Sequence, residues 1–389
     1  MSRGLVRHLG IPALGCLAAL VGSAATAPAS GGDERKTVLL LYTEARLTPE
    51  FATAEEALRE TLTAGPSVRV NYATYQLDVT IDADQRLDPD LAPVVRAAVR
   101  RSRADLVIVS RGAARFVMAQ RDTIFSGRPL VLLGLHRRDL PSMRLEGAVT
   151  AVLVAPAWGP TLNVALHLHP DTERVVVLNG ASVADREWAA HARADLAPYA
   201  SRVDITYLTG LPVDRMQTVL AQLPERTIVL VGPMLREGTD TRRTRGASIR
   251  TLLHQSIRPV YGLSESRLGE GIIGGYLWSA RDYGVKIAEV ALGILQGQWP
   301  FGQEVEVAAG GPIFDARQLK RWGISEAKLP AGSIVWFREP PVWQQPTPVL
   351  VSVGAVTLMI VAGVLLFQLT SRRRDVKFVH AHVPFERLL

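Results

Sequence analysis

Cysteine is almost absent from this chain: Cys16 is the only one among 389 residues. It lies in an apolar N-terminal run that has the features of a removable targeting segment. The mature chain is therefore expected to contain no disulfide and no catalytic thiol. Its fold has to be stabilised by a hydrophobic core, and the roughly 310 residues between this segment and an apolar run near the C-terminus are enough for two domains.

A strong charge of one sign is also lacking once the two ends of the chain are set aside. Of the formal charge of +7, residues 1–29 carry +2 and the last 19 residues carry +3, which leaves +2 for the rest. No basic stripe typical of nucleic-acid-binding surfaces is present. We therefore expect no nucleic-acid partner.

Motifs for catalysis, metal binding and nucleotide binding are missing too. The glycine-rich segment 269–276 has no GK[ST] and does not follow a first strand, so it predicts a tight turn and a close approach of strands. Ser110 and Ser264 do not lie in a G-x-S-x-G elbow. His167 and His169 fall at the end of a predicted helix, where their side chains point in different directions. We expect no enzyme activity, no cofactor and no metal site.

The longest hydrophobic run lies near the C-terminus. Residues Val349–Leu369 contain 21 positions without a charge, and a helix rising ~1.5 Å per residue would span a hydrocarbon core of ~30 Å. Arg372, Arg373 and Arg374 follow, which marks the cytoplasmic side. We therefore expect one transmembrane helix in a bacterial inner membrane, a periplasmic main domain and a short cytoplasmic tail, residues 370–389. A buried core helix is disfavoured by the length and the basic flank.

The N-terminus has the pattern of a secretory signal peptide. Basic residues precede the apolar run Ile11–Val21, and small residues follow it. Residues 1–29 are expected to be removed, with cleavage after Ala25 or Ala29. A retained signal anchor is the alternative, although the run is short for a membrane span.

Between these two segments, short apolar runs alternate with helical patterns. In the first half, strands are predicted at 37–42, 68–75, 106–110 and 129–134, and helices at 49–62, 89–101 and 113–120. After a link near 147–156, strands are predicted at 174–178, 203–208, 227–232 and 259–262, and helices at 161–168, 185–196, 213–223 and 247–255. Two further helices, 279–295 and 315–322, precede a Pro-rich spacer, 340–348.

This order predicts an α/β fold with parallel sheets and right-handed crossovers. Two blocks of similar size indicate two Rossmann-like lobes, 37–149 and 150–278, followed by a return helix and C-terminal segment, 279–339. Ligands of open α/β sheets bind at the carboxyl ends of the strands, so a ligand site is expected in a cleft between the lobes. Closure of the lobes around the ligand is the expected motion.

The predicted ligand-binding residues follow the strand ends. They are Thr43, Glu44, Arg46, Ser110, Arg111, Gly112 and His136 in the first lobe, and Asn179, Gly180, Ser182, Tyr261 and Ser264 in the second. The helix starts at 110–113 and 179–182 present backbone N–H groups suited to a carboxylate, and Arg111 is able to add a bidentate contact. Alternatively, these polar residues only cap helices.

Three phrases carry a resemblance to a known family. They are LHPDTERVVVLNGAS (168–182), PVYGLSESRLGEGIIGGY (259–276) and FDARQLKRWGISEAKLPAGSIVWFREP (314–340). They resemble the periplasmic sensor region of bacterial histidine kinases, which has the ABC-transporter substrate-binding-protein-like fold, and the resemblance covers about residues 38–338. It implies periplasmic-binding-protein type I-like lobes with three chain crossings, which would place 279–295 on the first lobe and 315–322 on the second.

The resemblance also implies a function in signal transduction. A small ligand would close the lobes, and the membrane helix would transmit the closure within a two-component system. The histidine-kinase core itself is not recognised, since His380 and His382 lack the flanking acidic residue of a phospho-acceptor. The chain is expected to be the input half of such a system without its kinase core, either as a broken kinase or as a stand-alone receptor.

Partners and ligands are less specific expectations. A histidine kinase or an ABC permease is the expected partner, and a signalling helix usually works as a homodimer. Aromatic amino acids or small carboxylates are suggested as ligands by analogy with related binding proteins. The alternative functions are a substrate-binding component of an ABC importer, tethered by its C-terminal helix, and an extracytoplasmic enzyme, which no residue constellation supports.

Overall fold

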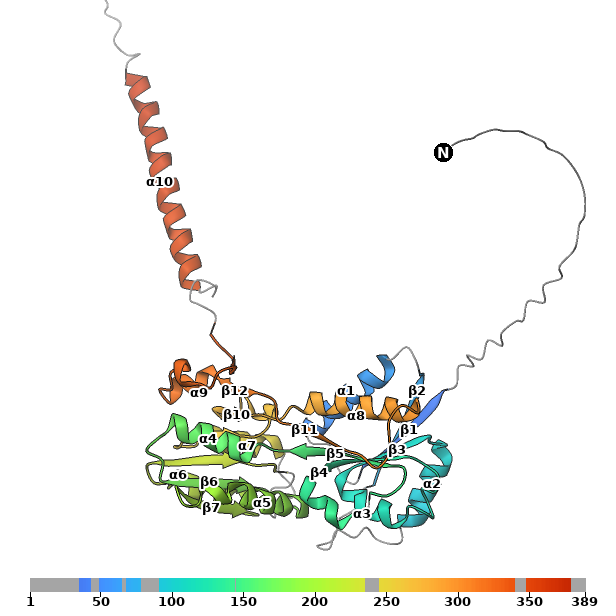
Figure 1. Cartoon of the computed structure of the whole chain (residues 1–389). Coiled ribbons are helices and arrows are strands. Elements are labelled where there is room, and N and C mark those ends of the chain that lie inside the picture. The colour runs from blue at the N-terminus through green and yellow to red at the C-terminus, as the bar shows by residue number, and fades with distance from the viewer. Residues whose placement is uncertain are drawn as a thin grey trace, which may run out of the picture.

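The computed structural model describes residues 35–42, 49–64, 68–77, 91–143, 145–234, 245–339 and 348–378. These residues form two α/β lobes and one long helix (Figure 1). The predicted signal peptide and the predicted ligand residues Thr43, Glu44 and Arg46 lie outside the described residues, as do most of the Pro-rich spacer and of the tail.

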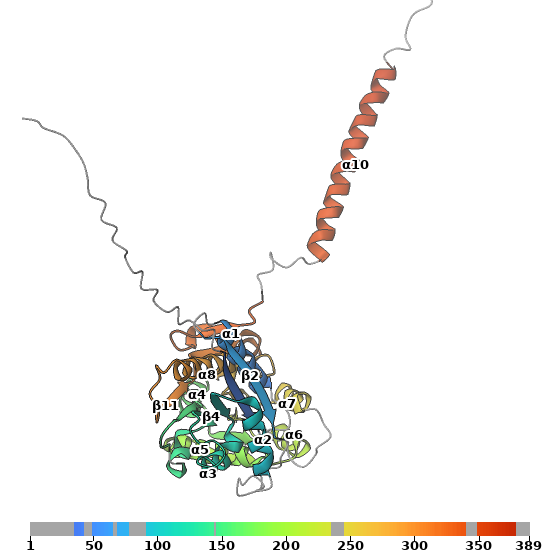
Figure 2. The same cartoon turned by 90° about the vertical axis from the view of Figure 1, so that its right-hand side faces the viewer.

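The first lobe contains a six-stranded parallel sheet. Its strand order is β11 (Glu304–Ala308), β5 (Val149–Ala155), β4 (Leu130–Leu135), β3 (Leu106–Val109), β1 (Lys36–Tyr42) and β2 (Val70–Gln76). Helices α2 (Ala92–Ser102) and α3 (Arg111–Ala119) pack on one face, while α1 (Pro49–Ala64) and α8 (Ala280–Leu295) pack on the other (Figure 2). Because both faces are covered, a central strand such as β3 is buried at every position.

The second lobe contains a four-stranded parallel sheet and a small accessory sheet. The larger sheet has the order β7 (Asp204–Thr209), β6 (Arg174–Asn179), β8 (Thr227–Val231) and β9 (Val260–Gly262). Helices α4 (Trp158–Leu168) and α5 (Val183–Leu196) pack on one face, while α6 (Val213–Ala221) and α7 (Arg245–His254) pack on the other. The accessory sheet joins β10 (Gly274–Tyr276), β12 (Pro312–Asp315) and β13 (Ile334–Trp336), with α9 (Ala316–Arg321) beside it.

The chain crosses between the lobes three times, as the resemblance implied. The crossings follow β5, β10 and β11. The second crossing returns α8 to the first lobe, where it packs along α1 and against the sheet core. The third crossing delivers β12 and α9 to the second lobe, where Phe314 and Leu319 join the core around Trp158.

The predicted link near 147–156 is wrong in one respect. Residues 149–155 form β5, which pairs with β4 on one side and β11 on the other, so it belongs to the first sheet. Its sequence VTAVLVA is almost entirely apolar because the strand is covered on both faces. The first crossing therefore lies between β5 and α4 rather than at residue 149, and the pairing partner β11 was not predicted.

The glycine-rich segment 269–276 makes a close approach between strands, as predicted. Gly274 has φ +147°, and a Cβ atom there would lie 2.1 Å from the carbonyl oxygen of Ile313 on the paired strand β12. Gly271 has φ +116°, and a Cβ atom would lie 2.8 Å from the backbone of Leu253. Only glycine fits both the backbone conformation and the space at these positions.

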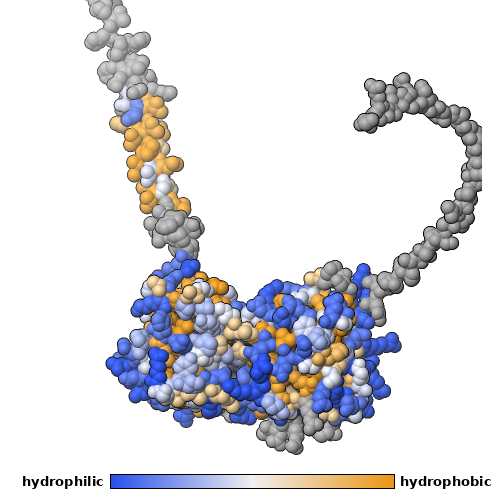
Figure 3. All heavy atoms as spheres, viewed as in Figure 1, coloured by the Kyte–Doolittle hydropathy of each residue, from blue (hydrophilic) through white to orange (hydrophobic). Residues whose placement is uncertain are grey.

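The C-terminal helix α10 spans Pro348–Phe378. Its stretch Val351–Ser371 is long and apolar enough to cross a membrane, with a mean hydropathy of 2.2, and none of it is buried against the rest of the protein. Figure 3 shows an apolar surface around this helix, in contrast to the mixed surface of the lobes. A stretch of this length that packs on neither lobe matches the predicted membrane-spanning run, 349–369.

Candidate functional site

A cavity of about 230 Å³ lies between the two lobes, at the carboxyl ends of strands from both sheets. The lining residues that end strands are Tyr42 of β1, Leu133 and Gly134 of β4, Val154 of β5 and Val231 of β8, with Gly232 directly after it. This is the position predicted for a ligand cleft, since the carboxyl ends of parallel strands meet at one edge of a sheet.

The wall of the cavity is mainly apolar. Three helices contribute residues at helical spacing, so each presents one face to the cavity. These residues are Phe51, Ala54 and Leu58 of α1, Val183, Ala184, Glu187 and Trp188 of α5, and Tyr283 and Ile287 of α8. Met234, Leu263 and Trp278 come from segments between elements. The aromatic rings in the wall are those of Tyr42, Phe51, Trp188, Trp278 and Tyr283.

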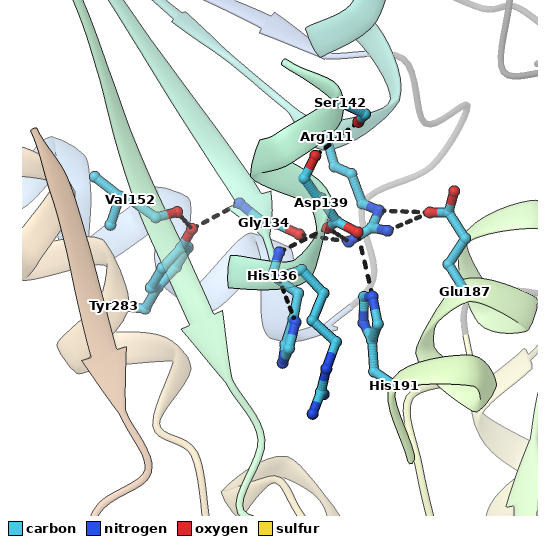
Figure 4. A network of polar contacts seen from close by, with 10 residues as sticks. Arg111, Gly134, His136, Asp139, Ser142, Val152, Glu187, His191 and Tyr283 are labelled. Carbon is cyan, nitrogen blue, oxygen red and sulfur yellow. Dashed lines mark hydrogen bonds and ion pairs between the residues drawn. The ribbon is translucent and has the colours of Figure 1, made fainter. Parts of the chain in front are cut away.

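Arg111, at the start of α3, joins the two lobes at one side of the cavity. Its Nη1 atom lies 2.8 Å from Oδ2 of Asp139 in the first lobe. Its Nε donates at 3.1 Å to Oε2 of Glu187 on α5 of the second lobe, and Nη2 pairs with the same carboxylate (Figure 4). A guanidinium held between two carboxylates from different lobes favours the arrangement in which the lobes are together.

Further contacts extend this junction along α5. Arg138 of the first lobe lies 2.7 Å from Asp195, and His191 Nε2 lies 3.2 Å from Oδ1 of Asp139. The ring of His136 stacks on that of His191 with a centroid separation of 4.1 Å. Arg138 and Asp139 lie in the 3-10 helix Arg137–Ser142, which follows β4, and His136 is its N-cap, so one short segment contacts α5. We call this set of residues, with Arg111 and Glu187, the lobe junction.

A second contact between the lobes involves the first turn of α1. Ser266 of the second lobe donates at 2.6 Å to the Glu50 carboxylate, and Arg267 lies 3.8 Å from the same oxygen. Arg267 also pairs with Glu270 at 3.0 Å. Both Glu50 and Arg267 line the cavity, so polar contacts hold the lobes together at two separate places on its wall.

Tyr283 of α8 braces the strands below the cavity. Its hydroxyl donates at 2.7 Å to the carbonyl oxygen of Val152 and accepts at 2.7 Å from the N–H of Gly134 (Figure 4). The register of β4 against β5 shifts at Gly134, which has φ +71°. The tyrosine therefore satisfies a backbone N–H that the bulge leaves unpaired, while burial raises the pKa of its hydroxyl.

Only some of the predicted ligand residues lie at the cavity wall. Arg111, Gly112 and Ser264 line it. His136 belongs to the lobe junction, and Ser182 caps α5 by accepting from the N–H of Asp185. Ser110, Asn179, Gly180 and Tyr261 are buried without lining the cavity. Tyr261 packs in the second-lobe core near Trp158 and Phe314, because its strand position faces α4.

Sequence reasoning missed the residues that helices contribute. Glu187, Trp188 and Tyr283 lie within helices rather than directly after strands, and Trp278 lies in the second crossing. One feature of the sequence could have indicated the cavity wall: Trp188, a large aromatic residue, lies near the start of a helix that follows a strand. Among the described residues, no group of three His, Cys, Asp or Glu side chains is placed to hold a metal ion. His167 is exposed, and His169 contacts Tyr261 edge to face.

The titration of the lobe junction is perturbed by its burial and its charges. Burial, with the neighbouring His191 and Arg138, lowers the pKa of His136 from 6.5 to about 4, although Asp195 and Asp139 oppose this. Burial alone would raise the pKa of Asp139, but the hydrogen bond with His191 and the charge of Arg111 lower it from 3.8 to about 2. Both lowered pKa values therefore make the folded state more stable at neutral pH than in acid.

The stability of the protein is expected to fall between pH 6.5 and pH 4. Because the folded-state pKa of His136 lies below its unfolded value, the unfolded chain binds the proton more readily as the pH drops through this window. The loss is expected to reach up to about 3 kcal/mol at pH 4. Asp139 adds a further loss below pH 3.8. Urea unfolding at pH 7.0, 5.5 and 4.5 measures how the free energy of unfolding changes with pH.

A matched variant isolates the histidine. His136→Asn keeps an acceptor for the N–H of Arg138, which the His136 ring now supplies at 3.1 Å, but does not titrate in this range. Its stability is expected to depend less on pH between 6.5 and 4 than that of the unchanged protein. Equal slopes for the two proteins would mean that His136 is not responsible.

Comparisons with known proteins show the fold. No family model matches the chain, and no curated protein matches its sequence. The ABC domain from Streptococcus pneumonia in complex with L-Trp is similar at TM-score 0.56 and 13% identity, with 77% of this chain and 100% of that chain covered. A ligand-free, open substrate-binding protein with adhesive properties from Clostridium difficile is similar at TM-score 0.53 and 12% identity, with 78% and 100% covered.

A third similar structure is an ABC transporter solute-binding protein from Bacillus halodurans with bound myo-inositol. It has TM-score 0.50 and 12% identity, with 77% of this chain and 100% of that chain covered. All three are similar over the two lobes at low sequence identity. The chain therefore has a two-lobe periplasmic-binding-protein type I-like fold, and solute-binding proteins are among its neighbours in structure.

Proposed function

We propose that this protein is a membrane-anchored periplasmic receptor that binds a small molecule between its lobes and transmits lobe closure to its C-terminal helix. The proposal rests on one observation above the others: a single cavity is lined by both lobes and flanked by ion pairs that join them. A ligand that contacts both walls has different contact free energies in the open and closed arrangements. It therefore shifts the equilibrium between them.

Signal transduction is favoured by the way the chain leaves the second lobe. Strand β13 is anchored to the second lobe by its pairing with β12. The exposed ion pairs of Arg338 with Glu326 at 2.7 Å and of Glu339 with Lys320 at 3.2 Å add little to this anchoring. Helix α10 begins at Pro348, nine positions after Glu339. A rotation of the second lobe would displace the start of the spacer and with it the membrane helix.

The partner in this reading is a histidine kinase or another two-component protein in the same membrane. The second candidate is a substrate-binding component of an ABC importer, and the similarity to ABC solute-binding structures favours it equally. The two differ in what lobe closure is used for. A sensor changes gene expression, whereas an importer component delivers its ligand to a permease.

A cavity-filling variant tests the role of the cleft in cells. Val183→Trp places an indole in the cavity wall, whereas Val94→Trp places one on α2, where Val94 is 42% exposed. Val183→Trp is expected to change the same transcripts as deletion of the gene, and Val94→Trp to match the wild type. A Val183→Trp strain that behaves as wild type, while the deletion strain does not, would refute a function in the cleft. Loss of solute uptake without changed transcripts would identify the importer function.

A further inference from the structure

The charged side chains that the described residues contribute to the cavity wall are each paired within the protein. Among the described lining residues, Arg111 is held by Asp139 and Glu187, and Arg267 by Glu270 and Glu50. Glu55 pairs with Arg59. A ligand carboxylate would have to displace one of these carboxylates from its guanidinium, or be buried without a counter-charge, which is strongly unfavourable.

The helix start at 179–182, predicted to suit a carboxylate, is already occupied by a negative charge. Asp185 is fully buried in the first turn of α5, and its carboxylate accepts from the N–H of Ser182 at 2.9 Å. The Ser182 hydroxyl in turn accepts from the N–H of Asp185. A second anion at this helix end would be repelled by Asp185, and two of the available donors are already used.

The wall also offers few free hydroxyl groups to a polyol. The Tyr283 hydroxyl is committed to Gly134 and Val152. The Ser264 hydroxyl lies 3.0 Å from that of Ser266 and accepts from its N–H. A sugar or inositol would lose hydrogen bonds to water here without replacing them, at a cost of about 1–3 kcal/mol per unpaired group.

Aromatic rings dominate what remains of the wall. Tyr42 and Phe51 meet edge to face with ring centroids 5.0 Å apart, and Trp278 and Tyr283 lie 5.3 Å apart. Trp188 lines the cavity from the second lobe. Ring edges and faces pack well against another aromatic ring, and about 230 Å³ exceeds the ~150 Å³ of an apolar cavity that binds benzene.

The indole N–H of Trp278 is a further polar group of a residue in this wall. This N–H is buried and has no hydrogen-bond partner within the part of the chain that the structure describes. A buried donor without a partner is unfavourable, so an acceptor atom on a bound molecule would add stability that a hydrocarbon cannot supply.

From these observations we propose that the cleft binds a small, uncharged aromatic molecule that carries a hydrogen-bond acceptor, such as an aryl ketone. This rests on the proposed function, because it names the ligand class of the same site. It also differs from the amino acids and small carboxylates that the resemblance suggested, since Arg111 is engaged in the lobe junction and is not free for a carboxylate.

Three matched probes test the ligand class on the full chain in detergent. Acetophenone has the ring and a carbonyl acceptor, ethylbenzene has nearly the same shape without an acceptor, and L-phenylalanine has the ring with both charges. Equilibrium dialysis is expected to rank acetophenone first, about tenfold or more ahead of L-phenylalanine. Val183→Trp, measured in the same detergent, should abolish the saturable component of acetophenone binding.

A second variant tests the acceptor. Trp278→Phe keeps a ring but removes the N–H, so it should weaken acetophenone binding about fivefold or more and leave ethylbenzene binding within about twofold. Tighter binding of L-phenylalanine than of acetophenone, blocked by Val183→Trp, would overturn the ligand class while leaving the receptor function intact. Acetophenone binding that Val183→Trp does not change would lie outside the cleft and would also overturn the proposal. Failure of the receptor function itself appears separately, in the transcript comparison.

Discussion

Replacing Arg111 with methionine is expected to destabilise the protein by about 2–4 kcal/mol and to separate the lobes. The guanidinium is 10% exposed and lies between Asp139, 12% exposed, and Glu187, 26% exposed. Methionine fills much of the same volume but removes the cation from between the two carboxylates. Asp139 keeps its contacts with His191 and with the N–H of His136, yet a nearly buried carboxylate that loses its guanidinium is costly. Urea unfolding measures the stability, and small-angle X-ray scattering measures the separation of the lobes.

Arg137 is a matched control for this substitution. It also pairs with two carboxylates, Glu304 at 2.7 Å and Glu306 at 3.0 Å, but it is 60% exposed. Arg137→Met is therefore expected to cost less than about 1 kcal/mol, since exposed ion pairs contribute little. Equal losses for the two variants would show that burial at the lobe junction has no energetic role.

Glu187→Gln distinguishes the two ion pairs of Arg111, the one with Asp139 in its own lobe and the one with Glu187 in the second lobe. In this variant Asp139 still pairs with the guanidinium within the first lobe, while the charge pair between the lobes is lost. The lobes are expected to open with a smaller change in unfolding free energy than in Arg111→Met. A radius of gyration identical to that of the wild type would argue that the Arg111–Glu187 pair does not hold the cleft closed.

Gly284→Ala is expected to lower the free energy of unfolding by about 2 kcal/mol or more, against the intrinsic preference of helices for alanine. Gly284 lies inside α8, where alanine is normally favoured by about 1 kcal/mol. Here, however, a Cβ atom would lie 2.1 Å from the carbonyl oxygen of Ala54 on α1. Because the obstacle is backbone, the two helices have to move apart, and α1 carries part of the cavity wall.

The control for this prediction is Gly311→Ala. Gly311 has no heavy atom within 4 Å of the added Cβ, and its backbone conformation is one that alanine adopts. Its substitution is expected to change the unfolding midpoint very little. A stabilised Gly284→Ala variant would mean that α1 and α8 tolerate a wider spacing than the structure has.

Much of the fold was predictable because its signals are local. Near-continuous apolar runs such as TVLLLY predicted buried parallel strands, and the face of the first helix that carries Ala54, Leu58 and Leu62 was identified correctly as its packing face. The helix 279–295 was placed on the first lobe through the resemblance. The strand β11 was not predicted, since EVEVA alternates at a sheet edge and resembles an exposed segment.

The cavity wall was predictable only in part, for a physical reason. Rules about strand ends located Arg111, Gly112 and Ser264 at the cleft, because the position of a loop follows from the topology. They did not locate Trp188, Trp278 or Tyr283, since a residue within a helix or crossing reaches the cleft only through the packing of the whole lobe. These rules also placed Ser182 at the ligand, whereas it caps α5, which was the alternative interpretation of the polar residues at strand ends.

The sequence alone predicted the architecture of this protein: two α/β lobes and a C-terminal apolar helix. This was possible because strand burial, helix periodicity and the length of an apolar run are local properties. Only the tertiary structure decided which charged side chains of the cleft are paired with one another. The sequence around Arg111 does not indicate that its guanidinium has a partner. The partner Glu187 comes into contact with it only because α5 packs against the first lobe. Electrostatic pairing between residues 76 positions apart depends on the relative placement of two lobes, which no local pattern records.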